Sequence, residues 1–360
     1  MEYLDTYYRL LPSFSKTYDF KICGLEDLDK VLDFFKKHWK ADHAFLKSRE
    51  LLDWQEFDVK NQRYNFALAI HKKTGEIHAL EGFILTSQFD PNIKKPMRWP
   101  AIWANRENVG RPGLGLMVHW FAIDTIPTPY YGVLGISEIA YPIYQKMDIT
   151  GTTKQWYILN TQKPSYSLVA NYEGAPKTNI TADVTNGRFV SLSIDDYLKL
   201  TGDIFERVPE YKSKMYYVNR YLKHPIYTYF ATMIVNEGAE KGDAIFFWRI
   251  CEHNSAKCIR IVDYFGDYAA MEGNLNNFLN MLFEEDAEFI DFINEGIDKI
   301  HFEKAGFVDR AKTDIILSNY FEPYHLKNVD YQYAFNSFDG NAYCPLFFKG
   351  DSDQDRPGVI

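Results

Sequence analysis

The sequence predicts an α/β (α+β) fold that consists of two tandem domains, each a mixed twisted sheet flanked by helices. With 360 residues, 46% of them hydrophobic, the chain is long enough to form two cores. Both halves run in the order strand pair, strand, loop, helix, strand, helix, and such repetition indicates a duplicated unit. Each half closes with a related hexapeptide, Tyr144–Ile149 or Phe302–Phe307, in which an amphipathic helix leads into a strand.

The first half is expected to begin with an extended N-terminal arm and a strand at 18–22. Between 25 and 39 apolar residues recur every three to four positions, with acidic residues in the first turn and basic residues in the last, which is typical of an amphipathic helix. The later elements are a helix at 48–56, strands at 65–71 and 77–86 joined by a hairpin turn, a strand at 99–104, a helix that ends near 125, a strand at 131–136 and a helix at 137–146.

A polar segment at 161–185, rich in Lys, Pro, Asn and Thr, is predicted to link a domain at 1–160 to a second domain at 186–360. The C-terminal residues 350–357 have no periodic apolar face, which by itself predicts a disordered tail. The elements expected in the second half are paired strands at 227–235 and 243–251, a strand at 257–264, a helix at 275–284, a strand at 289–293 and a helix at 297–304.

Composition excludes several classes of function. A formal net charge of −9 without a basic run argues against general nucleic-acid binding. The four cysteines form no CxxC pair and have no His at ligand spacing, so we expect no structural metal and a reducing, cytoplasmic environment. No apolar window approaches 18 residues, so neither a signal peptide nor a membrane span is predicted. No pattern in the sequence indicates an oligomeric state.

A glycine pair, Gly113 and Gly115, opens a helix directly after a strand, in the run 110–116. Glycine lets the backbone approach an anion closely, and free N–H groups at a helix N-terminus carry partial positive charge. The run is therefore a candidate phosphate cradle, to which Arg111 could add a charge, although a glycine pair alone is more often an ordinary tight turn. The matching run 266–273 has two acidic residues and no close glycine pair, so we expect it to repel a phosphate.

These motifs resemble those of the GNAT acyl-CoA N-acyltransferases. The hexapeptides are similar to the family signature Y-x-K-x-G-F, and Gly110-x-x-Gly113-x-Gly115 is similar to the cofactor loop Q/R-x-x-G-x-G/A, with the Arg at the second position instead of the first. The resemblance implies two GNAT-like domains. Because Phe302 replaces the tyrosine, the second is expected to shape the acceptor pocket without binding acyl-CoA. The residues implied in acyl-CoA binding by the first are Ile102, Trp103, Ala104, Arg111, Gly113, Leu114, Gly115 and Leu116.

The resemblance also implies a reaction, in which an amine attacks the thioester carbonyl and coenzyme A leaves as the thiol. A backbone N–H between about Trp103 and Asn105 is expected to polarise the carbonyl. Tyr144 is the candidate acid that protonates the leaving thiolate. The alternative for this tyrosine is a purely structural place in the core.

The general base has several candidates. His38 and His43 lie near Asp42 in the loop after the first helix, and the unperturbed pKa of histidine suits a base. Asp263 and Glu81, on predicted strands, are alternative catalytic carboxylates. Each of these side chains could equally have an ordinary role, at a solvated helix end or as a paired carboxylate, and a water chain without a dedicated base is a further alternative.

Other segments resemble the tandem GNAT enzymes that acylate dTDP-linked amino-dideoxysugars for bacterial surface polysaccharides such as O-antigen. The resemblance implies acetyl-CoA or 3-hydroxybutanoyl-CoA as the donor and a nucleotide sugar such as dTDP-3-amino-3,6-dideoxygalactose as the acceptor. It implies that the C-terminal segment folds over a domain surface, and that Trp39, Asp42, Trp54, Arg260 and Tyr264 contact the substrate rather than only packing. The matching segments are 38–43, 52–55, 99–103, 111–115, 260–264 and 350–357.

Two competing hypotheses remain open. A tandem GNAT protein could acylate another amine, such as an amino acid, a peptide or an aminoglycoside, and an aminoglycoside would favour a strongly acidic pocket. A degenerate pair of domains could instead serve as a scaffold. Retention of Gly113, Gly115 and Tyr144 argues for the enzyme, because a scaffold would not need them.

Overall fold

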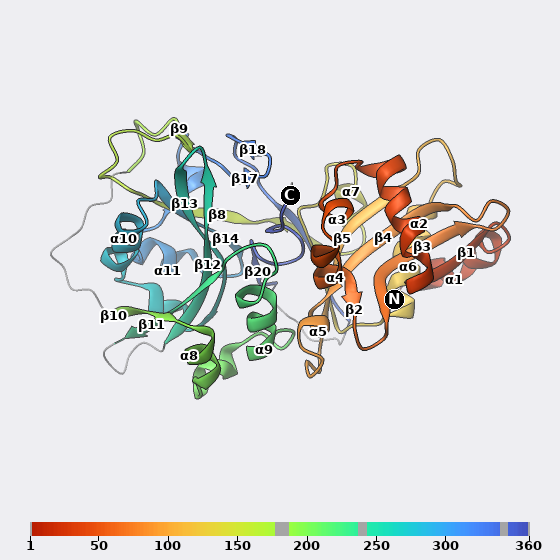
Figure 1. Cartoon of the computed structure of the whole chain (residues 1–360), viewed down its shortest axis with the longest axis horizontal. Helices are drawn as coiled ribbons and strands as arrows, with labels where there is room; N and C mark the ends of the chain where they lie inside the picture. The colour runs from red at the N-terminus through yellow and green to blue at the C-terminus, as the bar shows by residue number, and fades with distance from the viewer. Residues whose placement is uncertain (1, 177–186, 237–242, 339–344, 359–360) are drawn as a thin grey trace. The chain divides into compact units, whose positions relative to one another are not determined.

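The computed structural model describes residues 2–176, 187–236, 243–338 and 345–358, and the chain forms two compact units (Figure 1). Unit 1 comprises Met1–Thr150, Ala334–Ala342 and Arg356–Ile360, whereas unit 2 comprises Gly151–Tyr333 and Tyr343–Asp355. Neither unit is continuous in sequence. The units therefore differ from the predicted division at 160 and 186, because unit 2 begins earlier and two C-terminal segments return to unit 1.

The sheet of unit 1 is mixed. Its strand order is β1-β3-β4-β5-β6-β19-β7, and the short β2 pairs with β3. Strands β1, β3, β4 and β5 are antiparallel to their neighbours in that series, whereas β5 and β6 are parallel. The bounds are β1 Tyr18–Gly24, β2 Phe57–Asp58, β3 Arg63–His71, β4 Ile77–Leu85, β5 Met97–Asn105, β6 Tyr130–Leu134, β7 Ile149–Thr152 and β19 Gln332–Ser337.

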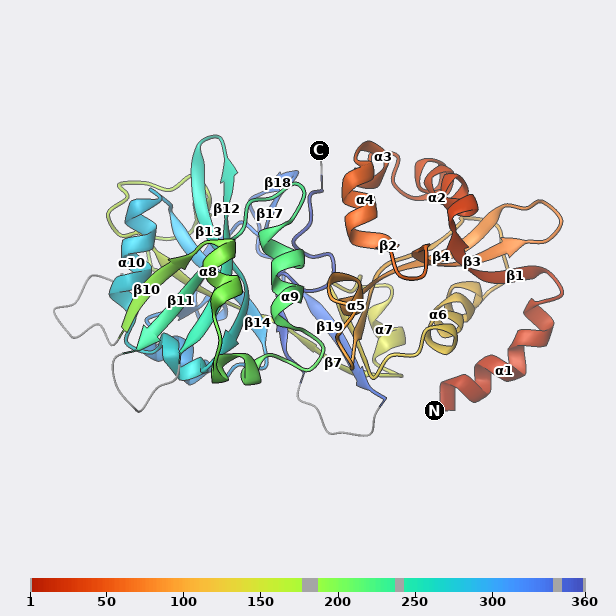
Figure 2. The same cartoon turned by 60° about the horizontal axis from the view of Figure 1, so that its bottom comes forward.

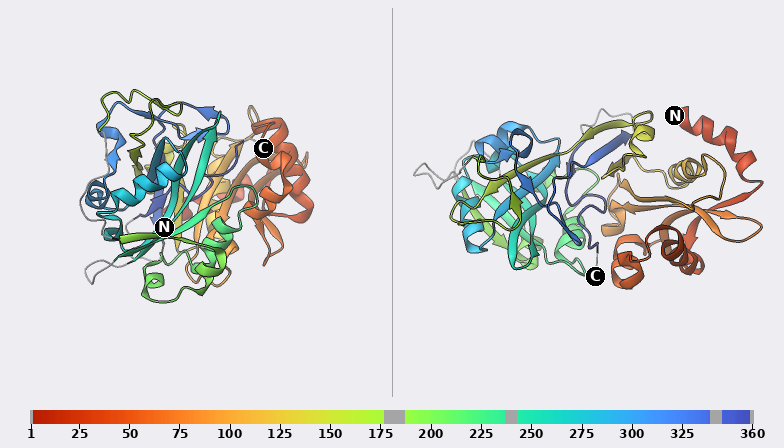
Figure 3. Two further views of the ribbon diagram at one scale, coloured as in Figure 1. Left: turned by 60° about the vertical axis from the view of Figure 1, so that its left-hand side comes forward. Right: turned by 90° about the horizontal axis from the view of Figure 1, so that it is seen from above.

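Helices cover both faces of this sheet (Figures 2 and 3). Along β3, Phe66 and Leu68 pack with α2, α3 and α4, whereas Ala67 and Ala69 pack with α1 and α6. This alternation is the period of two expected for a strand. The bounds are α1 Glu2–Phe14, α2 Leu28–Phe34 with a π-helical turn Phe35–Trp39, α3 Ala44–Lys47, α4 Arg49–Glu56 and α6 Leu114–Thr125.

Two predictions about unit 1 were wrong. The N-terminal arm is not extended but forms α1, whose buried Tyr7 and Phe14 pack against α6. Aromatic residues and an internal Pro12 disfavour a helix locally, so the packing of its apolar face decides its structure. The helix predicted at 137–146 is a single turn, α7 Tyr141–Tyr144, with Pro142 in its first turn. A further short helix, α5 Thr86–Phe89, precedes β5.

Unit 2 contains a second mixed sheet with strand order β10-β11-β12-β13-β14-β8-β15, and β20 pairs with β14. Adjacent residues of β12 again face opposite sides: Phe246 packs with Phe278 of α10, and Phe247 stacks on Tyr217 of α9. The bounds are β8 Lys154–Leu159, β10 Gly187–Leu192, β11 Phe230–Asn236, β12 Ala244–His253, β13 Ala256–Gly266, β14 Phe289–Glu295, β15 Val308–Asp309, β20 Phe347–Phe348, α8 Ile194–Lys199, α9 Lys214–Tyr217, α10 Leu275–Glu284 and α11 Lys299–Lys304.

Small elements complete unit 2. The predicted linker contains β9 Val169–Ala170, which pairs with β16 Ile316–Leu317, and its last residues lie outside the described part of the chain. Strands β17 Tyr320–Phe321 and β18 Tyr324–His325 form a second two-stranded sheet. The turn predicted between β11 and β12 also lies outside the described residues.

In each sheet two central strands, β5 with β6 and β13 with β14, are parallel, and the two strands of each pair diverge. Strand β5 pairs with β6 only at Met97 and Arg98, and β13 pairs with β14 only from Ile259 to Ile261. In unit 2 the chain's own C-terminal segment bridges the diverging strands. Strand β20 pairs with β14, the Lys349 N–H donates to the Ile293 carbonyl over 3.1 Å, and the Gly350 N–H donates to the Val262 carbonyl over 2.8 Å.

The C-terminal segment is therefore not a disordered tail. Asp355 accepts two hydrogen bonds from the Arg249 guanidinium, at 2.8 and 3.0 Å, and Asp351 lies 2.8 Å from the Lys212 ammonium. All four side chains are buried. Buried charges of this kind need partners, so ion pairs that a local sequence pattern does not reveal hold this segment, as far as Asp355, within unit 2.

Candidate functional site

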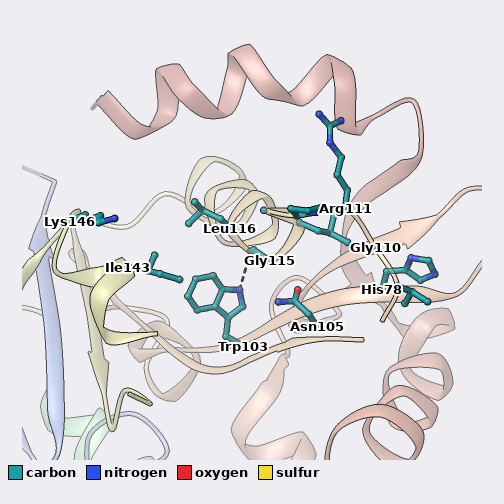
Figure 4. A pocket seen from close by; sticks show the side chains of 13 residues that line it. His78, Trp103, Asn105, Gly110, Arg111, Gly115, Leu116, Ile143 and Lys146 are labelled. Carbon is teal, nitrogen blue, oxygen red and sulfur yellow. Dashed lines mark hydrogen bonds between the residues drawn. The ribbon is translucent and has the colours of Figure 1, made fainter. Parts of the chain in front are cut away.

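The diverging strands β5 and β6 of unit 1 border two cavities. One, of about 270 Å³, is lined by Trp39, by residues 100–103 of β5, by 133–137 and by Ala140 and Tyr144. The other, of about 590 Å³, is lined by the loop 109–116 together with His78, Trp103, Asn105, Ile143 and Lys146 (Figure 4). Trp103 lines both cavities, so they meet at this side chain.

The N-terminus of α6 forms one wall of the larger cavity. Gly110 and Gly113 have φ values of 95° and 85°, in the left-handed region that glycine adopts without strain. At Gly115 the constraint is space rather than backbone conformation. The Trp103 indole N–H donates to the Gly115 carbonyl over 3.0 Å, and a Cβ at this position would lie 2.8 Å from the Asn105 side chain. The first N–H groups of a helix lack intrahelical partners and attract anions.

Two cations lie beside this loop. The Arg111 guanidinium does not point into the cavity but reaches α1 (Figure 4), where it donates to the Ser13 hydroxyl over 2.6 Å and lies 4.2 Å from the centre of the Phe14 ring. Lys146 is exposed and lines the opposite side of the same cavity. Arg111 therefore links the loop to α1 through its contacts with Ser13 and Phe14, and Lys146 is the lysine that lines the cavity.

Backbone N–H groups of β5 face the divergence. The Arg106 N–H donates to the His78 carbonyl of β4, and N–H groups alternate in direction along an antiparallel strand. The N–H groups of Trp103 and Asn105 therefore point away from β4, toward the side on which β6 has separated.

A chain of buried polar side chains lies between α6 and the sheet, next to Trp103. Nδ1 of His119 lies 2.6 Å from Oε2 of Glu81, and Nε2 of His119 lies 3.4 Å from the Tyr131 hydroxyl. A side-chain hydrogen bond joins Tyr131 to Tyr144. Burial, aided by the charge of Glu81, raises the pKa of Tyr144 well above its ordinary value. Tyr144 is therefore strongly biased to keep its proton.

Asp148 follows Tyr144 at the place where the hexapeptide signature has glycine. Its carboxylate accepts a hydrogen bond from the Asn336 side-chain amide of β19 over 2.9 Å. Burial outweighs this hydrogen bond and the nearby His119, and it raises the pKa of Asp148 from 3.8 to about 6. A carboxyl whose folded pKa is raised binds its proton more tightly in the folded state, so its ionisation costs stability as the pH rises from about 4 to about 6.

Asp148→Asn is therefore expected to stabilise the protein at pH 8 by up to about 3 kcal/mol, and to have no effect at pH 4, where the carboxyl is already protonated. Urea unfolding at the two pH values measures the difference. Asp33→Asn, at an exposed carboxylate paired with Lys37, is the control and should not stabilise at either pH. A loss of stability for Asp148→Asn at pH 8 would contradict this account.

The predicted bases lie in different surroundings. His43 is fully buried, accepts the Phe45 N–H at Nδ1 and caps α3, and burial lowers its pKa to about 3. His38 lines a separate cavity of about 310 Å³ with Glu76 and Arg106. Asp42 is exposed. The structure therefore does not bring these three side chains together with Tyr144.

The predicted aromatic substrate contacts of unit 1 also differ. Trp39, which is 40% exposed, lines the cavity that contains Tyr144, whereas Trp54 packs on Phe89 at 5.2 Å between ring centres. Of the two, only Trp39 is exposed to a ligand in that cavity. Ile102, which was expected to contact acyl-CoA, packs in the core under α2 to α4 and also lines the smaller cavity, whereas Ala104 packs in the same core.

The candidates in unit 2 are buried and hydrogen-bonded. Arg260 makes two bonds to Asp291, at 2.9 and 3.0 Å, and two to backbone carbonyls. Asp263 accepts from Lys212 and Tyr221, and the Tyr264 hydroxyl donates to the Asp267 carbonyl. These contacts give all three a structural role within unit 2. Among the described residues, no group of three or more His, Cys, Asp or Glu side chains is placed to hold a metal.

No family model and no curated protein match this sequence. Solved structures do. A GCN5-related N-acetyltransferase from Anabaena variabilis superposes with a TM-score of 0.50 at 9% identity, and a probable N-acyltransferase of unknown function from Enterococcus faecalis V583 with a TM-score of 0.50 at 13% identity. Each alignment covers 88% of this chain and 72% of the other. At such identities the likeness shows the fold: two mixed sheets flanked by helices, in a tandem GNAT-like arrangement. The predicted fold class is confirmed.

No helix in the described residues is long and apolar enough to cross a membrane.

Proposed function

We propose that unit 1 is an acyl-CoA-dependent N-acyltransferase. The observation that carries this proposal is the divergence of β5 from β6, where a glycine-containing helix N-terminus, the Trp103 N–H and Tyr144 surround two cavities that meet at Trp103. A fold alone does not define a function. Here the fold is combined with an anion site, a donor for a carbonyl and a proton donor, which are the groups that acyl transfer from a thioester requires.

Each group has an assigned part. The N–H groups of Gly113, Gly115 and Leu116 hold the pyrophosphate of acyl-CoA, with Lys146 as a nearby charge, and β5 runs along the pantetheine. The Leu114 N–H is not part of this set, because it donates to the Arg111 carbonyl over 3.0 Å. The Trp103 N–H polarises the thioester carbonyl. The amine nitrogen bonds to the carbonyl carbon, the C–S bond breaks, and the thiolate takes the proton of Tyr144.

The general base stays open. His43 is neutral and its ring caps α3, and His38 lies in a separate cavity, so a water chain is favoured over either histidine. The ion pair of Asp263 with Lys212 disfavours that carboxylate. In unit 2 the bridge of residues 347–350 occupies the divergence of β13 and β14. This supports one acyl-CoA site per chain.

The acceptor that we propose is a dTDP-linked amino-dideoxysugar, with an acetyl or 3-hydroxybutanoyl donor, and the support for it is the sequence resemblance of residues 38–43, 52–55, 99–103, 111–115, 260–264 and 350–357. One observation favours the alternative of a different amine. None of the described residues that line the cavity next to Tyr144 is charged, whereas a nucleotide diphosphate needs positive charge nearby.

Thiol release tests the proposal. The purified protein is incubated with acetyl-CoA or 3-hydroxybutanoyl-CoA and with a panel of dTDP-amino sugars, amino acids, peptides and aminoglycosides. Release that depends on one dTDP-amino sugar supports the full proposal, and release that depends on another amine moves the acceptor to that class. Failure to bind any acyl-CoA would overturn the proposed function and leave the scaffold hypothesis.

Gly115→Ala is expected to weaken acyl-CoA binding about tenfold, equivalent to about 1.4 kcal/mol. The new methyl group would contact Asn105 at 2.8 Å and the Trp103 indole nitrogen at 3.1 Å, so the loop or these side chains must shift in the wall of the cavity. Calorimetric titration with acetyl-CoA measures the change. Gly174→Ala, where an added Cβ meets nothing within 4 Å, is the matched control, and equal affinities for the two variants would contradict the assigned site.

A further inference from the structure

A buried polar cluster lies beside the candidate site. It consists of four hydrogen-bonded side chains, Glu81, His119, Tyr131 and Tyr144, and the proposed function uses only Tyr144. Each of the four side chains is no more than 2% exposed, although three of them come from the middle of apolar segments. Glu81 lies directly opposite Trp103 in the β4–β5 pairing, so both occupy the face of the sheet that α6 covers. A role for this cluster in catalysis rests on the proposed function of unit 1.

The protonation state of His119 sets the direction of the whole hydrogen-bond chain. In a neutral imidazole one nitrogen donates and the other accepts. If His119 is neutral, Nδ1–H donates to Glu81, and Nε2 must accept the Tyr131 O–H. The Tyr131 oxygen then accepts the O–H of Tyr144. In that state the proton of Tyr144 points away from the cavity and is not available to a leaving thiolate.

Protonation of His119 reverses the direction of the hydrogen bonds that join His119, Tyr131 and Tyr144. Both ring nitrogens then donate, Nδ1–H to Glu81 and Nε2–H to the Tyr131 oxygen. The Tyr131 O–H is thereby free to donate to the Tyr144 oxygen, and the O–H of Tyr144 is left to donate into the cavity that Tyr144 lines. The 2.6 Å contact between Glu81 and His119 is short, as expected for a charge-assisted pair.

The geometry points to His119 as a positioning residue of the acyl transfer: as an imidazolium held by Glu81, it orients Tyr131 and Tyr144 so that Tyr144 donates its proton to the leaving thiolate. Neither His119 nor Glu81 touches the substrate in this arrangement. They act through the two tyrosines, and the ionised pair is the active form.

The charges that face this pair are consistent with an ionised state. Arg98 of β5 lies with its guanidinium 5.6 Å from the centre of the Tyr131 ring, and Asp148 interacts electrostatically with His119. The titratable or charged groups packed around His119 are therefore Glu81, Arg98, Tyr131, Tyr144 and Asp148, from β4, β5, β6, α7 and the residue before β7. With Asp148 ionised, two carboxylates lie near the imidazolium.

The protons balance in the transfer. The amine nitrogen bonds to the carbonyl carbon and gives up one proton to the base or to water, while the thiolate takes the proton of Tyr144. Tyr144 takes the proton of Tyr131, Tyr131 takes the Nε2 proton of His119, and His119 becomes neutral. After the products leave, a proton from water enters at Tyr144 and returns the chain to its first state.

Kinetics test the inference. The kcat of thiol release is expected to fall at alkaline pH, where the four hydrogen-bonded side chains lose the proton that orients Tyr144, and this fall is the alkaline limb of the pH profile. Glu81→Gln keeps the shape but loses the charge, so kcat should fall at least about tenfold with KM for acyl-CoA changed less than about twofold. Glu81→Asp keeps the carboxylate and should retain the alkaline limb. The matched control is Glu272→Gln, at the His301–Glu272 pair of unit 2, which has a 2.8 Å contact and should leave kcat unchanged.

A second measurement does not depend on activity. In nitrogen NMR spectra of histidine-labelled free protein at neutral pH, His119 should carry protons on both ring nitrogens, and in Glu81→Gln on one. A bare ring nitrogen on His119 in the unmodified protein, or an unchanged kcat in Glu81→Gln, overturns the inference. Absence of thiol release with every amine overturns the proposed function instead, and the NMR spectra still decide the state of His119.

Discussion

Replacing Tyr144 with Phe is expected to lower the kcat of thiol release by about 100-fold, within the range that a positioned proton donor contributes. The hydroxyl is the group at the edge of the smaller cavity that can protonate the thiolate, and it carries its proton at neutral pH because burial raises the pKa of Tyr144. The ring packs with Trp103 at 5.7 Å between centres, and Phe preserves this contact. Acyl-CoA affinity, measured by calorimetry, should therefore stay unchanged.

The distinguishing comparison for Tyr144→Phe is its thermal unfolding. A variant that unfolds at the same temperature as the original protein and binds acyl-CoA normally, but turns over slowly, has lost a proton donor. A variant with full kcat would contradict the assignment of Tyr144 and leave the thiolate to be protonated by water. The same measurement on Tyr131→Phe distinguishes the effect of losing the proton donor from the effect of losing the hydrogen bonds that orient it, because Tyr131 does not line the cavity.

Asp291→Asn is expected to destabilise unit 2 by about 3–5 kcal/mol, the usual cost of removing one partner of a buried ion pair. Asp291 accepts two bonds from Arg260 and one from the Gln155 side chain at 3.0 Å, and all three side chains are buried. An amide in place of the carboxylate leaves the guanidinium without its counter-charge and turns an N–H₂ donor toward other donors. Because a domain is stabilised by only about 5–15 kcal/mol, the loss should be evident in urea unfolding.

The control for this prediction is an ion pair of similar length at the surface. Lys312 and Glu303 lie 2.9 Å apart with both side chains exposed, so Glu303→Gln should cost far less stability, because solvent screens an exposed ion pair. Similar losses for the two variants would mean that solvent screens the Arg260–Asp291 pair. That result would also reopen Arg260 as a substrate contact.

Local sequence pattern predicted much of the fold. The strands expected at 65–71, 77–86 and 99–104 are found as β3, β4 and β5 within a few residues, and the helix at 275–284 is α10. These elements carry strong periodic or β-branched and aromatic signals, which depend only on neighbouring residues. The glycine loop before α6 was also located from the sequence, because closely spaced glycines between a strand and a helix indicate a tight turn at the helix N-terminus.

The candidate site could be predicted only in part. Gly113, Gly115, Trp103 and Tyr144 line the two cavities, as the motifs suggested. His119 and Tyr131 were missed. A single histidine inside the apolar helix Leu114–Thr125 was a possible signal, but its meaning depends on Glu81, 38 positions away. Which side chains meet across β4, β6 and α6 follows from strand register and helix packing, and neither is encoded in a local pattern.

The sequence by itself determined where many of the helices and strands form, where glycine opens a helix, and that the unit is repeated, because these follow from interactions between residues close in the chain. The tertiary structure decided the rest. Residues 2–14 form α1 although they include aromatic residues and a proline. Strand β19, near the C-terminal end of the sequence, lies beside β6. The two-residue β20 pairs with β14 where β13 and β14 diverge in unit 2. Each of these depends on burial against distant residues, and contacts between residues far apart in the chain leave no periodic signal in either segment.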